Sequence, residues 1–227
     1  MRIKENSANA ITLLNAIFGF LGCIALTQLR YDLALGALLL AAMADFLDGF
    51  VARWLKVDSA YGNFLDSMAD LVSFGLLPSL WWYYALSDTL SQSLSIIAAL
   101  MLFVAALLRL VRFSVYPANT THFEGLPTPA MALFVVLLTR TDLFEDLSYF
   151  TPVWFSRTVL LLSVVLSLWM ISKIPAVSLK FEGVGFKQNV LRYLVLLGAV
   201  VGCITLADDF VLVLLPVYVL SAAFIKR

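Results

Sequence analysis

The chain has 227 residues, of which 62% are hydrophobic and 13% are charged, and its mean hydropathy is +0.96. This composition excludes an ordinary water-soluble enzyme, a coiled coil and a disordered chain, and it predicts an integral membrane protein. Fifteen basic and fifteen acidic residues cancel, so we expect no bulk attraction to nucleic acid.

Apolar runs between charged, proline or glycine breaks predict an all-α bundle of eight transmembrane helices, with residues 1–227 forming one domain. In chain order the expected helices are 10–29, 33–54, 62–85, 92–115, 128–144, 153–172, 190–207 and 209–225. The fifth is the weakest, because its clean apolar stretch, 129–139, would rise only about 16 Å. We expect the aromatic run Trp81, Trp82, Tyr83 and Tyr84 to anchor the third helix at the membrane interface.

The basic residues indicate which helix ends face the cytoplasm. If the N-terminus is inside and all eight helices cross, twelve of the fifteen Lys and Arg residues are cytoplasmic, and Arg30, Arg140 and Arg157 are outside. This distribution fits the excess of Lys and Arg in cytoplasmic loops. We therefore expect the fifth helix to cross, both termini to be cytoplasmic, and the protein to be a multi-pass protein of the cell (inner) membrane with its site facing the cytoplasm.

Four aspartates lie within or beside the second and third apolar helices: Asp45, Asp48, Asp66 and Asp70. Each carboxylate placed deep in a membrane costs about 2.5–3.5 kcal/mol, so four of them need compensation. The members of each pair are three or four residues apart and share one helical face, and the short connection 55–60 lets both pairs aim at one point. A carboxylate cluster without His or Cys favours Mg²⁺ or Mn²⁺, and it can hold two ions that clamp a pyrophosphate.

The same aspartates are also compatible with two structural roles and with one function of another class. The first role is a charged side chain that extends to the membrane surface, which suits Lys and Arg better because they are longer than Asp. The second is an ion pair with a basic residue, but only Arg53 and Lys56 lie near in the sequence, too few for four acids. A divalent-cation transporter is the function of another class, since intramembrane acids also mark ion pathways, but all four acids lie at one expected depth.

Read as a pattern, these positions give D-x-x-D-G-x-x-A-R, eight further residues, and G-x-x-x-D-x-x-x-D between residues 45 and 70. The pattern resembles the motif of the CDP-alcohol phosphatidyltransferase family, membrane enzymes of phospholipid synthesis that move a phosphatidyl group from a CDP-linked lipid to an alcohol and release CMP. The resemblance implies that Asp45, Asp48, Asp66 and Asp70 bind two Mg²⁺ or Mn²⁺ ions, and that Asp70 also takes the proton of the attacking hydroxyl. It implies a CDP-lipid site lined by Asp48, Gly49, Ala52, Arg53, Gly62 and Asp66.

A second segment, residues 109–130, bears on the acceptor alcohol. It contains R-L-V-R-F-S-V-Y from Arg109 and H-F-E-G-L-P-T-P-A from His122. Arg109 and Arg112 are three residues apart at a helix end, where topology alone would also explain them, and Thr128 is expected to cap the next helix. Together these segments look like those of the membrane-integral phosphatidylserine synthases within the family, as does N-A-I-T-L-L-N-A-I-F-G at 9–19.

This second resemblance implies CDP-diacylglycerol and L-serine as substrates, phosphatidylserine and CMP as products, and a homodimer among membrane lipid. It places Thr12 and Asn15 near the nucleotide. The candidates for binding serine's carboxylate and ammonium are Arg109, Arg112 and Glu124. One residue, Ser114, departs from the subgroup, where Asn is expected after R-F. The alternative acceptors are glycerol 3-phosphate and an inositol phosphate, whose phosphate calls for a denser basic pocket.

Overall fold

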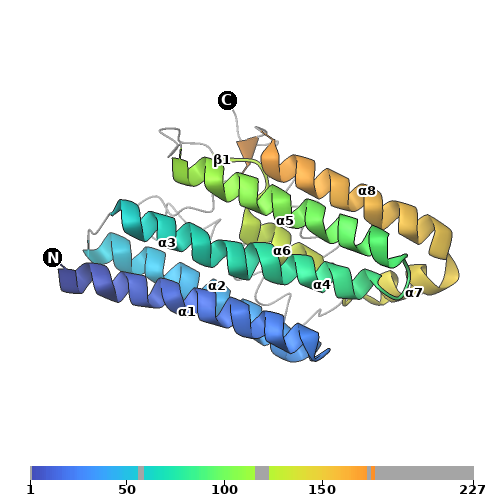
Figure 1. The fold of residues 1–227 in the computed structure, drawn as a ribbon, viewed down its shortest axis with the longest axis horizontal. Helices are drawn as coiled ribbons and strands as arrows, with labels where there is room; N and C mark the ends of the chain where they lie inside the picture. The colour runs from blue at the N-terminus through green and yellow to red at the C-terminus, as the bar shows by residue number, and fades with distance from the viewer. Residues whose placement is uncertain (1, 56–58, 116–122, 173–174, 177–227) are drawn as a thin grey trace, which may run out of the picture.

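The computed structural model describes residues 2–55, 59–115, 123–172 and 175–176 (Figure 1). The expected all-α class is confirmed for these residues, except that β1 (Phe123–Glu124) pairs antiparallel with β2 (Pro175–Ala176). The helices in chain order are α1 (Arg2–Thr27), α2 (Tyr31–Leu55), α3 (Ala60–Asp70), η1 (Leu71–Leu76), α4 (Leu77–Leu86), α5 (Gln92–Val115), α6 (Thr128–Leu138), α7 (Asp142–Phe150) and α8 (Pro152–Ile171).

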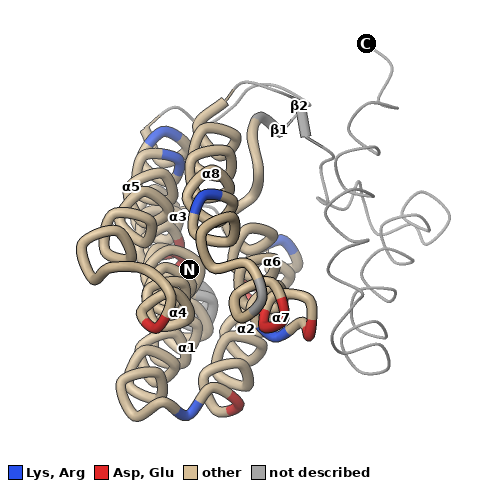
Figure 2. The backbone as a smooth tube through the Cα atoms, turned by 90° about the vertical axis from the view of Figure 1, so that its right-hand side faces the viewer, with Lys and Arg blue, Asp and Glu red and all other residues tan. Residues whose placement is uncertain are grey.

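Four helices in the described part of the chain are long and apolar enough to cross a membrane: α1 from Asn9 onward, α2, α5 and α8. Large apolar side chains on their outer faces are exposed, as Phe20 (60%) and Leu161 (64%) illustrate. Such surfaces suit lipid rather than water as the surrounding solvent. Figure 2 shows that charged residues are sparse along these helices and that acidic ones gather on α7.

The helices run roughly along one long axis, with α1, α2 and the α3–α4 rod on one side and α5 and α8 on the other (Figure 1). The start of α1, the C-terminal end of α2, the start of α3 and the C-terminal ends of α5 and α8 all lie toward one end of the bundle. This end therefore collects both segments that the sequence singles out.

The expected third helix, 62–85, is confirmed as an unbroken helical rod of three parts, α3, η1 and α4. Ser59 begins it as an N-cap, its hydroxyl accepting from the Gly62 N–H at 3.0 Å. The middle part, η1, is a π-helix, and the Leu77 N–H bonds the Val72 carbonyl five residues earlier. A π-helical segment inside a longer helix often marks a functional region, and this one directly follows Asp70.

The expected fifth helix, 128–144, is wrong at its end, because α6 stops at Leu138 and α7 starts at Asp142. The Thr141 hydroxyl accepts from the Phe144 N–H at 3.2 Å and so caps a new helix. The 11 residues of α6 rise about 16 Å, roughly half of the hydrocarbon thickness. The expected sixth helix, 153–172, is α8, while the expected helices 190–207 and 209–225 lie outside the described residues.

Two tryptophans expected at the membrane interface are core residues instead. Trp81 and Trp82 are 1% and 0% exposed, because α4 is packed on both sides and successive helical side chains point in different directions. Their indole N–H groups donate at 2.8 Å to the hydroxyls of Thr139 and Ser163, respectively. Trp81 packs in a cluster with Leu26, Leu38, Phe74 and Val136, and Trp82 in a second cluster with Leu102, Met131, Leu166 and Met170.

Candidate functional site

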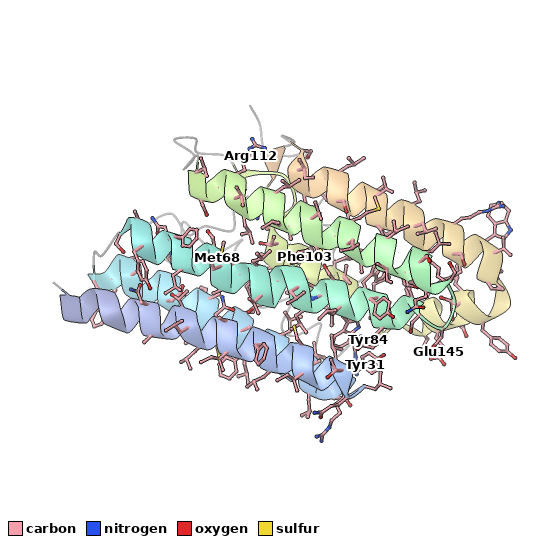
Figure 3. All side chains as sticks on the ribbon, in the orientation of Figure 1. Tyr31, Met68, Tyr84, Phe103, Arg112 and Glu145 are labelled. Atoms are coloured by element: carbon pink, nitrogen blue, oxygen red, sulfur yellow. The ribbon has the colours of Figure 1, made fainter. Side chains whose placement is uncertain are left out.

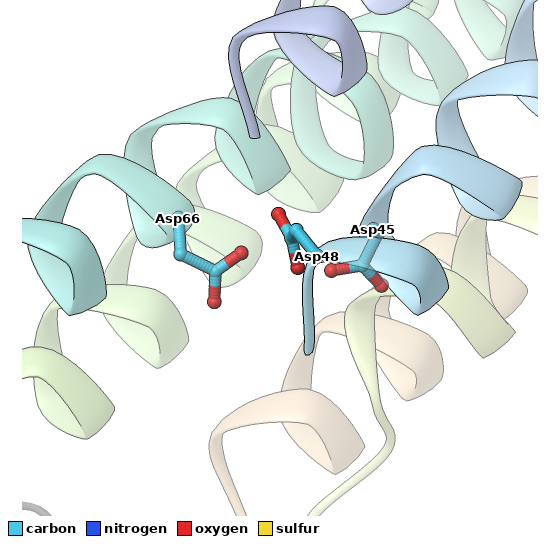
Figure 4. Close-up of side chains that lie close together, drawn as sticks. All are labelled: Asp45, Asp48 and Asp66. Atoms are coloured by element: carbon cyan, nitrogen blue, oxygen red, sulfur yellow. The ribbon is translucent and has the colours of Figure 1, made fainter. Parts of the chain in front are cut away.

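Three of the four aspartates come together between α2 and α3, as Figure 4 shows. One carboxylate oxygen from each of Asp45, Asp48 and Asp66 lies within 4.8 Å of the other two. Asp48 is buried, and the other two are half-buried. Asp45 and Asp48 project from the same face of α2 because they are three residues apart, and α3 brings Asp66 to them across the helix pair.

The three carboxylates lie inside the bundle rather than at its end. Asp48 is seven residues before the end of α2, and Asp66 is six residues after the start of α3. At 1.5 Å per residue, these carboxylates are about 10 Å inside the helix ends. At that depth an uncompensated negative charge is costly, so the group calls for a positive partner.

The donor set fits a hard divalent cation such as Mg²⁺ or Mn²⁺. It contains three carboxylates and no His or Cys. At a metal–oxygen distance of about 2.0–2.1 Å, two oxygens on opposite sides of one Mg²⁺ ion are about 4 Å apart, so oxygens within 4.8 Å of one another need only small side-chain shifts to share an ion. Within the described part of the chain, the buried Oδ2 of Asp48 has no hydrogen-bond partner, as expected of an oxygen built to meet a cation.

Arg53 does not lock these carboxylates in ion pairs. Its side chain is exposed, and its Nη1 lies 3.4 Å from the position that a Cβ on Gly49 would take. Arg53 attracts Asp45 and Asp48 electrostatically, but among the described residues no ion pair joins it to either one. Ala52, expected with them in the nucleotide site, is half-buried on the same helix, and Gly62 is half-buried on α3.

Asp70 is positioned separately from the other three aspartates. It is one helical turn beyond Asp66 and is not a member of the 4.8 Å group, although the charges of Asp45 and Asp66 act on it. Its Oδ1 accepts a hydrogen bond of 3.1 Å from the Nδ2 of Asn15 on α1. Whether Asp70 binds metal and takes a proton therefore stays a prediction, but the structure places it beside the group, held from α1.

One face of α1 contacts both acidic helices. Thr12 is buried and hydrogen-bonds the carboxylate of Asp48, one turn before Asn15 reaches Asp70. One turn further on, a Cβ on Gly19 would lie 2.7 Å from the Cα of Ser73, so α1 and η1 touch closely there. Thr12 and Asn15 thus bind the aspartates themselves, and their expected contact with the nucleotide stays a prediction.

Two serines in the site escaped the sequence analysis. The Ser67 hydroxyl accepts from Ser114 at 2.7 Å and donates to the Asn63 carbonyl at 3.1 Å, which ties α5 to α3 beside Asp66. Ser73 is fully buried and bonds across to α1. The sequence signal that could have identified both serines is a hydroxyl inside an apolar helix, because such side chains commonly hydrogen-bond a neighbouring helix.

Arg109 and Arg112 point to different partners. Arg109 is 5% exposed, donates to the Thr128 hydroxyl at 3.4 Å and lies 4.7 Å from the Phe113 ring centroid. Arg112 reaches the end of α8, where its Nη1 lies 3.5 Å from the Ile171 carbonyl oxygen (Figure 3). Thr128, expected as a helix cap, is instead the first residue of α6 and has no such role, its N-cap being Pro127. Arg109 is six residues before the end of α5, about 9 Å in, at a depth comparable to that of the aspartates.

The segment before α6 is fastened to the C-terminal end of α8. Gly125 has φ +74°, and a Cβ there would lie 2.6 Å from the Met170 carbonyl oxygen. The Leu126 N–H donates to the Trp169 carbonyl at 3.3 Å. The backbone of Glu124 is in β1, while its side chain lies outside what the structure describes.

Comparison with known proteins agrees with the motif. A family model described as CDP-alcohol phosphatidyltransferase matches residues 5–224. Similar proteins include the archaetidylserine synthase of Methanothermobacter thermautotrophicus, 31% identical over 61% of this chain and 59% of that protein. They also include proteins named CDP-diacylglycerol--serine O-phosphatidyltransferase from Mycobacterium leprae (35% identical; 59% of this chain, 48% of that one) and Bacillus subtilis (34%; 58% and 73%). The matches thus cover about half to three quarters of each relative's length.

Proposed function

Because the chain belongs to the CDP-alcohol phosphatidyltransferase family, we propose that it transfers the phosphatidyl group of CDP-diacylglycerol to the hydroxyl of L-serine, giving phosphatidylserine and CMP. The observation that carries this proposal is the group of three carboxylates about 10 Å inside an apolar bundle. The relatives named as serine O-phosphatidyltransferases support serine as the acceptor.

Asp45, Asp48 and Asp66 hold Mg²⁺ or Mn²⁺ in this proposal, with Asp70 completing a site for two ions. When bound, the ions neutralise the pyrophosphate and the charge that develops on departing CMP. Asp70 accepts the proton of the serine hydroxyl as the new bond from oxygen to phosphorus forms and the bond from phosphorus to the CMP oxygen breaks. The CDP-lipid lies along the α2–α3 pair, where Gly49, Ala52 and Gly62 leave room for it, with Arg53 and Thr12 around it.

Arg109 is the residue that binds the serine carboxylate. It is a buried cation at a depth similar to that of the aspartates, and Thr128 and Phe113 fix its guanidinium. A guanidinium matches a carboxylate with two parallel hydrogen bonds. Arg112 assists from the helix end, and Glu124 accepts from the serine ammonium.

The membrane setting of the proposal is a multi-pass protein of the inner membrane, in which the chain crosses eight times and both termini are in the cytoplasm. The fifth crossing is made by the short α6 together with the segment that precedes it. The bundle end with the C-terminal ends of α2 and α5 carries Arg53, Arg109 and Arg112, whereas α7, with Asp142, Glu145 and Asp146, lies at the other. The site then faces the cytoplasm, where serine is available, and two chains associate as a homodimer.

The direct test supplies the purified protein with CDP-diacylglycerol and a mixture of serine, glycerol 3-phosphate and an inositol phosphate, and identifies the lipid product by mass spectrometry. We expect phosphatidylserine, formed only when Mn²⁺ or Mg²⁺ is present. A product made from another alcohol would overturn the choice of acceptor. Divalent-metal flux into proteoliposomes without lipid turnover would favour a transporter instead.

A further inference from the structure

We propose that Asn15 and Ser73 form a clamp that positions the Asp70 carboxylate, and that Asn15 acts in turnover through Asp70 rather than by contacting the nucleotide. The clamp is defined by two hydrogen bonds, from Asn15 Nδ2 to Asp70 Oδ1 (3.1 Å) and from Ser73 Oγ to the Asn15 carbonyl (2.9 Å). The role assigned to Asp70 rests on the proposed function.

The first hydrogen bond fixes the plane of the carboxylate. The terminal torsion of an Asp side chain has broad minima, so the group rotates readily unless something holds it. Asn15 is fully buried and engages Oδ1, and among the described residues no hydrogen bond is made by the second oxygen of Asp70. That second oxygen is therefore the one available to take a proton.

The second hydrogen bond fixes Asn15 itself. Ser73 is fully buried in η1, three residues after Asp70, so the same rod that carries the carboxylate also holds the backbone of its donor. Gly19 makes this possible, because a Cβ there would lie 2.7 Å from the Cα of Ser73 and would push α1 away. The side chain and the backbone of Asn15 are thus both hydrogen-bonded to the helical rod that carries Asp70.

The clamp also leaves little of the Asn15 side chain to meet a nucleotide. Its amide nitrogen donates to Asp70, and its own Oδ1 is buried with no hydrogen-bond partner among the described residues. Both polar atoms of this side chain are therefore enclosed by the helix packing.

The test compares Asn15→Ala and Ser73→Ala with the matched control Ser79→Ala in steady-state transfer assays. Ser79 is a buried serine of the same rod, but among the described residues its hydroxyl bonds only the Gly75 carbonyl, one turn earlier in that rod. We expect kcat to fall about 10- to 100-fold for Asn15→Ala and several-fold for Ser73→Ala, because a hydrogen bond to a charged group is lost or loosened. The KM for CDP-diacylglycerol should stay within about twofold in both variants, and Ser79→Ala should match the wild type.

A higher KM for the CDP-lipid with kcat unchanged in Asn15→Ala would overturn the proposal in favour of a nucleotide contact. A separate double-mutant cycle, combining Asn15→Ala with Asp70→Ala and measuring thermal unfolding, tests the contact without activity. Non-additive shifts support the clamp, and additive shifts overturn it. If the wild type transfers lipid to no alcohol, the proposed function fails, while this cycle still decides whether the clamp exists. If Asn15→Ala does not fold, Ser73→Ala against Ser79→Ala decides the kinetic question.

Discussion

Replacing Gly125 with Ala should loosen the segment that precedes α6. An L-residue held at φ +74° costs about 1–2 kcal/mol, and the new Cβ would meet the Met170 carbonyl oxygen at 2.6 Å. Relieving that contact moves the chain away from α8 and breaks the bond from the Leu126 N–H to the Trp169 carbonyl, which is worth about 0.5–1.5 kcal/mol. The expected destabilisation is about 1.5–3.5 kcal/mol in total.

The assay is thermal unfolding in detergent, together with KM values for both substrates. At about 2–4 °C per kcal/mol for a chain of this size, the midpoint should fall by roughly 3–14 °C. The KM for serine should rise, because Thr128, which holds Arg109, follows directly in the chain, while the KM for the CDP-lipid should change little. The control is Gly36→Ala on α2, where a Cβ would meet nothing within 4 Å and should not destabilise. A midpoint within 1–2 °C of the wild type would refute this reasoning about strain.

Three further predictions follow from the site and its surroundings. Asp48→Asn should raise the Mn²⁺ concentration needed for half-maximal activity at least tenfold, because a charged ligand is lost from the carboxylate group; an unchanged metal titration would argue against Asp48 as a ligand. Asp70→Asn should lower kcat by about 10²- to 10⁴-fold while CDP-lipid binding persists, since Asn cannot accept the proton, and a near-normal rate would show that Asp70 is not the base. Arg140→Ala breaks the 3.0 Å ion pair with Asp32, whose side chain is 89% exposed, and should cost less than about 1 kcal/mol in unfolding measurements; a larger loss would mean that the pair holds α2 to the end of α6.

The long helices and the acidic group could be predicted because each has a strong local signal. The expected spans 33–54 and 92–115 differ from α2 and α5 by at most two residues at either end, since long apolar runs with charged ends mark a membrane helix. The sequence predicts the proximity of Asp45, Asp48 and Asp66, because helical spacing determines which residues share a face.

The features that the sequence analysis missed depend on contacts between distant segments. Thr141 ends an apolar run by capping a new helix, which outweighs the hydropathy that favours a continuous one. Trp81 and Trp82 look like interface anchors until the serine and threonine that accept from their indoles are known. The bond from Asn15 to Asp70 joins residues 55 apart, and no spacing rule connects them.

The neighbouring indoles of Trp81 and Trp82 have a mechanical consequence. One lies in the cluster built with α1 and α2, which border the carboxylates, and the other in the cluster built with α5 and α8, which border Arg109. If the α1–α2 side moved away from the α5–α8 side, both indole rings would lose packing contacts, and their hydrogen bonds to Thr139 and Ser163 would break. Under the proposed function, small local shifts near the helix ends are therefore a less costly route for substrates than opening the whole bundle.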